Sequence, residues 1–345
     1  QSNIEIANNL FINKKYSAAQ NLYNQKIISE DYNESILYNH AKCSKELFNS
    51  DALFLYKKFL EEYPHSFLVN DVYTDIALIY YRSKNYLEAA NFFKKIDPKM
   101  LGTDLQFKLA YCYFKADSLT DASYYFSKII STNSNLSDPS RYYFAHILYS
   151  HENYDEALEN FIKLKSSEKF SSIVPYYIAQ IYFIKKDYDK VIKLISKIIN
   201  NLKPSRYSEM NRLLAESYFH VNDFNNAILY FEKYMAASEP SDYDLYLLGL
   251  SYYNINYHQN AIDNFIKISS FSDTLMQYSA YYLGFCYINL NNLNYAMQAF
   301  KKSSALNYNW KLKEESYYNY AKLSYELNFP FDNTLKVLTS YNKIF

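Results

Sequence analysis

Glycine is almost absent from this chain. The 345 residues contain three glycines, and two of them, Gly249 and Gly284, occupy equivalent positions of a recurring pattern. Phosphate-binding loops of the P-loop and dinucleotide-binding classes need several glycines, which let the backbone approach the phosphates closely. The sequence therefore excludes nucleotide-binding enzymes of both classes.

Cysteines and recognisable catalytic groups are also scarce. The three cysteines, Cys43, Cys112 and Cys286, are too few and too scattered for a disulfide framework, and we expect them to be buried thiols. None of the six histidines pairs with Cys, Asp or Glu at a spacing typical of zinc ligands. No nucleophile can be recognised together with a base and an orienting group. We therefore predict no metal, no cofactor and no enzymatic activity.

Neither charge of one sign nor long apolar segments dominate the chain. Its 36 basic residues balance 36 acidic ones, so no long-range field would attract nucleic acid. RNA-reading helical arrays have a similar repeat length and stay open as an alternative. The longest apolar runs, such as residues 244–253, are well short of the ~20 residues that cross a bilayer. We predict no nucleic-acid partner and no transmembrane segment.

What the sequence has instead is a repeat of 33–37 residues. Each copy has a small residue, an aromatic or aliphatic residue three positions after it, an alanine twelve positions after the small residue, and an aromatic residue four positions beyond the alanine. Counted from the small residue, the last two therefore lie at offsets of 12 and 16 in the best copies. These copies are Ala77, Tyr80, Ala89 and Phe93; Ala110, Tyr113, Ala122 and Phe126; Ala145, Leu148, Ala157 and Phe161; Ala215, Tyr218, Ala227 and Phe231; Gly249, Tyr252, Ala261 and Phe265; Gly284, Tyr287, Ala296 and Phe300. Looser copies begin at Ala7, Ala41, Ala179 and Ala321, which makes ten units. Such a period is typical of helix–turn–helix arrays.

This pattern resembles the tetratricopeptide repeat (TPR) family over essentially the full chain. The resemblance implies an all-α fold, a right-handed α-solenoid of about ten helix–turn–helix units. We expect residues 1–345 to form a single continuous array, with units starting near residues 1, 35, 70, 103, 138, 172, 208, 242, 277 and 314. Because the last helix has apolar residues with little polar capping, we expect a fragment of a longer protein that can self-associate through its C-terminal end. The apolar residues are Leu335, Leu338, Tyr341, Ile344 and Phe345.

In TPR arrays the concave groove is lined mainly by the first helix of each unit. The lining positions lie three before, one after and four after the small residue, and they share one helical face. Here most of them are aromatic, and Arg212 and Glu216 make a polar break in unit seven. Aromatic rings offer large contact area at low conformational cost. We predict that a protein or peptide partner contacts Phe107, Tyr111, Phe114, Tyr142, Tyr149, Tyr176, Phe183, Phe219, Tyr246, Tyr253, Tyr281, Phe285, Tyr318 and Tyr325.

Two alternatives to a binding groove stay open. In one, the aromatic side chains pack against the adjacent unit, and the chain is a structural spacer or oligomerisation module without a separate ligand. In the other, the chain is the regulatory domain of a larger enzyme. We favour a non-catalytic scaffold that binds protein segments. Family members that hold a C-terminal carboxylate use Lys and Asn at successive groove positions, where this chain has Tyr, Phe or Thr. A co-chaperone role of that kind is not expected.

Units two and three resemble a narrower group within the family. Residues 56–66, which include the turn Tyr63-Pro64-His65-Ser66, look like units of periplasmic TPR proteins of Gram-negative envelopes. That group includes the Tol–Pal-associated coordinator of outer-membrane constriction and the TPR lipoprotein of outer-membrane protein assembly. The resemblance predicts a periplasmic, outer-membrane-associated location and a role in an envelope assembly, secretion or division complex. The cytoplasm stays open as the alternative location.

Overall fold

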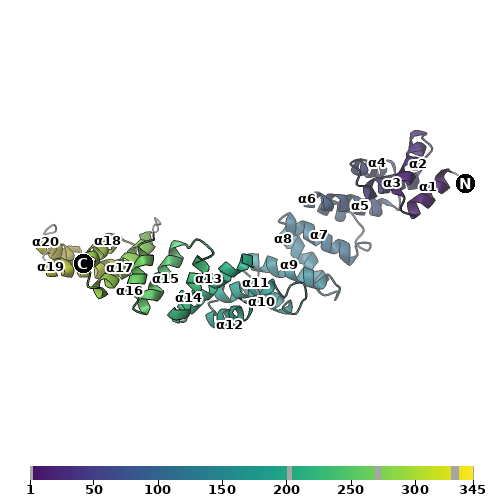
Figure 1. Cartoon of the computed structure of the whole chain (residues 1–345). Helices are drawn as coiled ribbons and strands as arrows, with labels where there is room; N and C mark the ends of the chain where they lie inside the picture. The colour runs from purple at the N-terminus through teal and green to yellow at the C-terminus, as the bar shows by residue number, and fades with distance from the viewer. Residues whose placement is uncertain (1–2, 200–203, 269–272, 328–333, 345) are drawn as a thin grey trace. The chain divides into compact units, whose positions relative to one another are not determined.

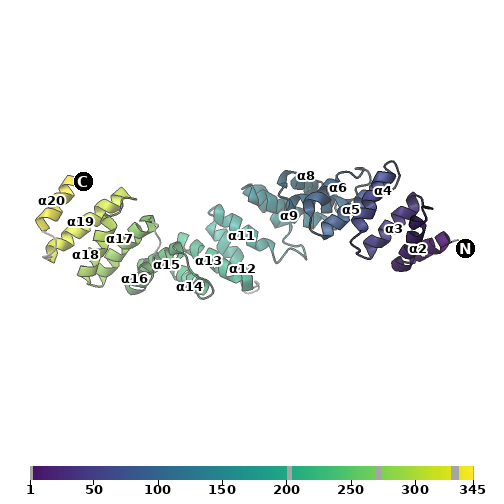
Figure 2. The ribbon, with the colours of Figure 1, turned by 90° about the horizontal axis from the view of Figure 1, so that it is seen from above.

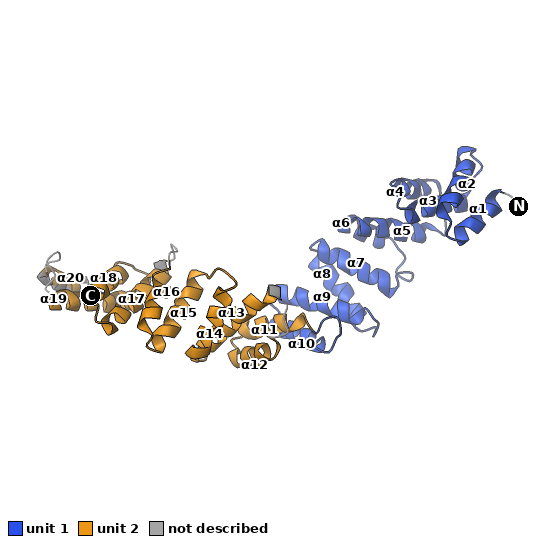
Figure 3. Ribbon diagram, in the orientation of Figure 1, with its two compact units in different colours: residues 1–171 blue, residues 172–345 orange. Residues whose placement is uncertain are grey.

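The computed structural model describes residues 3–199, 204–268, 273–327 and 334–344. Within these ranges the chain forms twenty α-helices and no strand, and it is 75% helical. The prediction of an all-α fold is therefore confirmed. The helices group into two compact units, residues 1–171 and residues 172–345 (Figures 1 and 3).

Unit 1 consists of five helical hairpins. Each hairpin pairs an odd-numbered first helix with an even-numbered second helix, and each helix packs on the next one along the chain (Figure 2). The first helices α3 and α5 are also in contact. The helices are α1 (Asn3–Ile12), α2 (Tyr16–Ile28), α3 (Glu34–Glu46), α4 (Ala52–Glu62), α5 (Val69–Arg82), α6 (Tyr86–Phe93), α7 (Thr103–Lys115), α8 (Leu119–Ile130), α9 (Ser137–Ser150) and α10 (Tyr154–Lys163).

Unit 2 repeats this arrangement with five more hairpins. Here every first helix also contacts the first helix of the following hairpin, so these helices form a continuous row from α11 to α19. The helices are α11 (Val174–Ile184), α12 (Tyr188–Ile198), α13 (Pro204–His220), α14 (Phe224–Met235), α15 (Asp242–Asn254), α16 (His258–Phe265), α17 (Asp273–Asn289), α18 (Leu293–Ser304), α19 (Trp310–Glu326) and α20 (Thr334–Ile344).

The core of each hairpin is the contact that the repeat pattern predicts. The small residue, the later alanine and the final aromatic residue of the six best copies are all buried. In unit 2, a Cβ atom added at Gly249 would lie 2.6 Å from the ring of Phe265, and one added at Gly284 would lie 2.5 Å from the ring of Phe300. A residue without a side chain therefore lets the aromatic ring of the second helix approach the backbone of the first helix.

Nearly identical turns join the two helices in the nine hairpins whose turns lie in the described residues. One residue in each of these turns adopts a left-handed conformation, with φ between 57° and 63°. The next residue donates its backbone N–H to a carbonyl five positions earlier, over 2.8–2.9 Å. This is the Schellman arrangement that satisfies carbonyls at a helix C-terminus, here built without glycine. The left-handed residues are Lys14, Phe48, Lys84, Asp117, Glu152, Lys186, Asn222, Asn256 and Asn291.

Glycine at these turn positions should make the folded protein more stable than the natural residue does. A left-handed conformation places Cβ close to the following carbonyl oxygen, and glycine removes that repulsion. We expect Glu152→Gly to raise the free energy of unfolding of unit 1 by about 0.5–1 kcal/mol, measured by denaturant titration. His151→Gly is the matched control, because His151 has φ of −92° and gains nothing from glycine. Equal destabilisation by both substitutions would contradict the conformational argument.

Candidate functional site

The fourteen predicted groove residues lie on the first helices α7, α9, α11, α13, α15, α17 and α19. Twelve of them are half-buried. The exceptions are Tyr318, which is 55% exposed, and Tyr325, which is 69% exposed. The predicted surface is therefore mostly covered by the chain itself, and both exposed members belong to α19.

Tyr143 explains how the groove residues of α7 become half-buried. It lies on α9, two positions before the small residue Ala145. Its ring centroid is 6.2 Å from that of Phe107, 5.4 Å from that of Tyr111 and 5.1 Å from that of Phe114. These three are the predicted groove residues of the preceding hairpin. A side chain from the next hairpin therefore packs among all of them.

Tyr282 occupies the same place in unit 2. It lies on α17, two positions before Gly284, and its ring centroid is 6.4 Å from that of Tyr246 and 5.2 Å from that of Tyr253. It also stacks on Phe265 at 6.3 Å. We call the position two before the small residue the plug position. Sequence reasoning missed it, although its constant offset in the repeat could have indicated it.

Asp75 fills the plug position of α5 with a charge. It is 2% exposed, and its carboxylate accepts hydrogen bonds from Lys42 Nζ at 2.8 Å and Lys45 Nζ at 2.5 Å. Tyr56 donates its hydroxyl to the same carboxylate at 2.7 Å. Lys42 and Lys45 stand one and four positions after the small residue Ala41, so they are groove positions of unit two. The plug position, which holds packed aromatic rings in α9 and α17, holds a buried ion-pair network in α5.

The polar break predicted in unit seven is an ion pair on α13. Arg212 Nη1 contacts the carboxylate of Glu216, whose side chain is 5% exposed. Burial raises the pKa of Glu216, Arg212 opposes that rise, and the nearby carboxylate of Asp244 adds to it. Asp244 is itself buried, with one oxygen bonded to the backbone N–H and the hydroxyl of Ser241. This part of the inner face is closed and charged.

Two groove tyrosines hold carboxylates from the next hairpin. Tyr176 donates its hydroxyl to Glu209 at 2.7 Å, and Tyr281 donates to Glu315 at 2.7 Å. Each tyrosine stands three positions before the small residue of its unit, and each glutamate stands six positions before the next small residue. Burial and the adjacent carboxylate both raise the pKa of these two tyrosines. Their hydroxyls therefore stay protonated and oriented toward the carboxylates.

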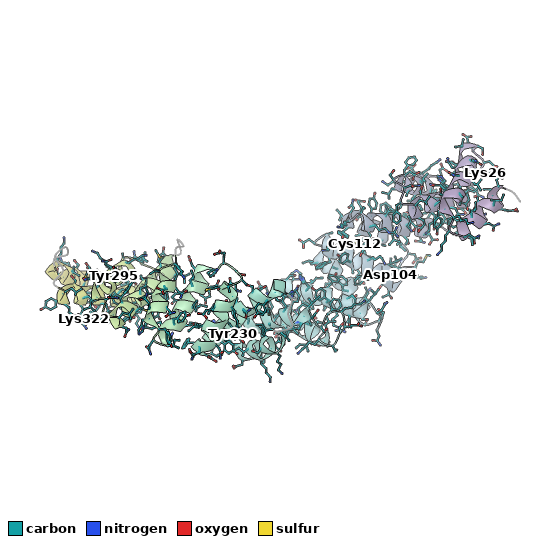
Figure 4. The ribbon with its side chains drawn as sticks, in the orientation of Figure 1. Lys26, Asp104, Cys112, Tyr230, Tyr295 and Lys322 are labelled. Carbon is teal, nitrogen blue, oxygen red and sulfur yellow. The ribbon has the colours of Figure 1, made fainter. Side chains whose placement is uncertain are left out.

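Two adjoining cavities lie beside the exposed tyrosines of α19. Lys322, which is labelled in Figure 4, lines the second of them. The first has a volume of about 370 Å³ and is lined by Tyr281, Phe285, Lys311, Glu314, Glu315, Tyr318, Asn319 and Tyr341. The second has about 420 Å³ and is lined by Tyr318, Ala321, Lys322, Tyr325 and Tyr341. Tyr318 and Tyr341 line both. Aromatic groove residues and open volume thus coincide at α17, α19 and α20.

The three cysteines are buried free thiols, as the sequence predicted. Burial raises the pKa of Cys43, Cys112 and Cys286 to about 12. Thiols in this state are poor nucleophiles, because the reactive form is the thiolate. They pack as small apolar side chains.

Comparison with known proteins agrees with the helical hairpin architecture. A family model described as "Anaphase-promoting complex, cyclosome, subunit 3" matches residues 220–303. The C-terminal part of a TPR repeat-containing protein from Cytophaga hutchinsonii superimposes with a TM-score of 0.52 at 15% identity, covering 68% of this chain and 96% of that one. The chain has the fold of a TPR solenoid. A chain in the structure of Naa15/Naa10 bound to HypK-THB gives a TM-score of 0.52 at 11% identity, covering 99% of this chain and 58% of that one.

These likenesses establish the TPR fold and leave the specific role open. No curated protein sequence matches the chain significantly. No helix in the described part of this chain is both long enough and apolar enough to span a membrane.

Proposed function

We propose that this chain is a non-catalytic scaffold that binds an extended segment of a partner protein along helices α17 and α19 of unit 2. The observation that supports it is the coincidence of aromatic groove residues with open volume at α17 and α19. Tyr318 is 55% exposed and lines both cavities there. Large, partly exposed tyrosine rings beside a cavity are typical of protein interfaces, because they bury much area at low conformational cost.

A structural spacer is the second candidate, and the plug residues favour it for the rest of the groove. Tyr143 and Tyr282 pack among the predicted groove residues of α7 and α15. Those aromatic residues already have partners within the chain. The proposed binding surface is therefore narrower than the sequence predicted, and its centre is Tyr318.

The proposed compartment and the proposed complex are both argued from the amino-acid sequence. The turn Tyr63–Ser66 resembles envelope TPR proteins, so we propose an envelope assembly, secretion or division complex in the periplasm as the setting. Self-association through the C-terminal end also stays a proposal. The side chains of Leu335, Leu338 and Ile344, and the whole of Phe345, lie outside the described residues.

Peptide capture by the full chain tests the proposed function. We expect a displayed library of random 12-residue peptides to yield binders whose affinity falls by about 2 kcal/mol or more with Tyr318→Ala, measured by fluorescence anisotropy of synthetic copies. Tyr295→Ala is the matched control, because Tyr295 is 59% exposed but lies on the second helix α18. Recovery of no binder, or equal loss with both variants, would favour the structural spacer.

A further inference from the structure

The first cavity opens where a plug residue is short. Tyr282 fills the plug position of α17, but the corresponding residue of α19, two positions before Ala321, is Asn319. Its amide nitrogen is bonded to the backbone carbonyl of Glu315 at 2.8 Å, so the side chain folds back on its own helix. The rings of Tyr281 and Phe285 are therefore left beside the cavity of about 370 Å³.

The chain contains a second copy of this site in which the space is used. Tyr176 on α11 donates to Glu209 on α13, as Tyr281 on α17 donates to Glu315 on α19. The guanidinium of Arg206 lies 4.3 Å from the centroid of the Tyr176 ring. At Tyr176 the chain therefore already shows the arrangement in question. An arginine stacks on the tyrosine ring, and the tyrosine hydroxyl is bonded to a glutamate.

Two residues that complete the site at Tyr176 are replaced in the site at Tyr281. Gln180, which donates to Glu209 at 3.0 Å, corresponds to Phe285, since each follows the small residue directly. Arg206 stands nine positions before Ala215, and the residue nine positions before Ala321 is Leu312. Phe285 offers no donor and Leu312 offers no charge. The site at Tyr281 keeps the tyrosine and the glutamate and lacks the groups that complement them.

The charges around the cavity favour a cation. Glu314 and Glu315 line it together with one lysine, Lys311. The next two lysines on α19 have other partners. Lys313 Nζ is 2.5 Å from the side-chain oxygen of Asn307, and Lys322 Nζ is 4.0 Å from the carboxylate of Glu326. Two carboxylates against one ammonium leave net negative charge beside aromatic faces, an arrangement that attracts a guanidinium.

We propose that this cavity binds an arginine side chain from an extended segment of a partner protein. The guanidinium stacks on Tyr281 and pairs with the carboxylate of Glu315, as Arg206 stacks on Tyr176 beside Glu209. An apolar side chain two residues away in the same segment enters the adjoining cavity at Tyr318 and Tyr325, because alternate residues of an extended segment lie on the same side. The inference rests on the proposed function and names the chemistry of its partner.

The test uses a peptide selected on the full chain and its citrulline variant. Citrulline keeps the shape of arginine and removes its charge. We expect arginine to be enriched among selected peptides, and citrulline to weaken binding at least tenfold. Glu315→Gln, which keeps an acceptor for Tyr281, should weaken the arginine peptide to a similar extent and leave the citrulline peptide unchanged. Asp263→Asn on α16 is the control, because Asp263 lines neither cavity.

Two further substitutions copy the filled sites of the chain. Asn319→Tyr installs the plug that Tyr282 provides, and Leu312→Arg installs the equivalent of Arg206. Both should reduce binding of the arginine peptide at least tenfold while circular dichroism shows an unchanged helical spectrum and melting profile. Each acts by occupying the cavity. The hydrogen bond that Asn319→Tyr removes runs to a backbone carbonyl of its own helix, so the packing of α19 on its neighbours is kept.

The outcomes separate this inference from the proposed function. Peptides that need Tyr318 but bind equally well with arginine, citrulline or lysine would overturn the arginine assignment and leave peptide binding intact. Binding that resists Asn319→Tyr and Leu312→Arg would likewise overturn the assignment of the cavity. Absence of any peptide whose binding depends on Tyr318 would reject the proposed function together with the inference.

Discussion

Phe265→Ala is expected to lower the free energy of unfolding of unit 2 by about 3–5 kcal/mol. Phe265 is 2% exposed and belongs to a cluster that includes Ala227, Leu248 and Ala261. Its ring also stacks on Tyr282, the plug residue of the next hairpin. The substitution removes buried area and leaves a cavity at the junction of two hairpins. Denaturant unfolding followed by native-state hydrogen exchange of α14–α18 measures the loss.

A double-mutant cycle with Gly249 tests the cause. A Cβ atom at position 249 would meet three atoms of the Phe265 ring at 2.6–2.9 Å. We expect Gly249→Ala to destabilise the natural protein, because overpacking at this contact outweighs the better helix propensity of alanine. In a Phe265→Leu background the same change should become neutral or stabilising. An identical effect in both backgrounds would show that the close ring contact does not govern the position.

Asp75→Ala is expected to lower the free energy of unfolding of unit 1 by about 3–5 kcal/mol, because it leaves the buried ammonium of Lys45 with only its longer, 3.4 Å contact to Glu46. Lys45 is 6% exposed and has its Nζ 2.5 Å from Asp75. Lys42 is 28% exposed and can turn toward water, so most of the cost falls on Lys45. Urea unfolding of the full chain, followed by exchange protection of α3–α5, measures the change.

A second substitution should reverse most of that loss. Lys45→Met keeps the length of the side chain and removes the charge, so Asp75→Ala with Lys45→Met should regain more than half of the lost stability. Asp104→Ala is the matched control, because Asp104 forms an exposed pair with Lys108 on a single helix and should matter little. If Asp75→Ala were as mild as that control, the buried network would not stabilise unit 1.

Much of the fold could be predicted from sequence because the main contacts of each repeat join residues that are close together in the chain. The small residue and the aromatic residue sixteen positions later face each other within one hairpin, so their spacing alone predicts the contact. Ala77 and Phe93, which form such a pair in unit three, are both fully buried. The turns were predictable for the same reason. The turn Ser83-Lys84-Asn85 joins two helices and is held by backbone hydrogen bonds to the end of the first helix.

The candidate site was predicted only in part, because its exposure depends on the next hairpin. The sequence placed Tyr111 and Tyr281 on a helical face, and both lie on first helices as expected. It did not show that Tyr143 would pack on Tyr111, whereas Asn319 would fold back and leave a cavity beside Tyr281. Those residues are more than thirty positions apart, and no local pattern connects them.

The sequence by itself determined that this chain is a helical repeat, where its helices lie, and which residues form the core of each hairpin. Those features follow from periodicity, since residues at fixed offsets share a face whatever surrounds the hairpin. Only the tertiary structure decided which groove residues are covered and which are open. The reason is that a side chain at the plug position, Asp75, Tyr282 or Asn319, belongs to one hairpin but packs against the preceding one. Its size and charge determine whether that place holds an ion pair, a stacked ring or a cavity.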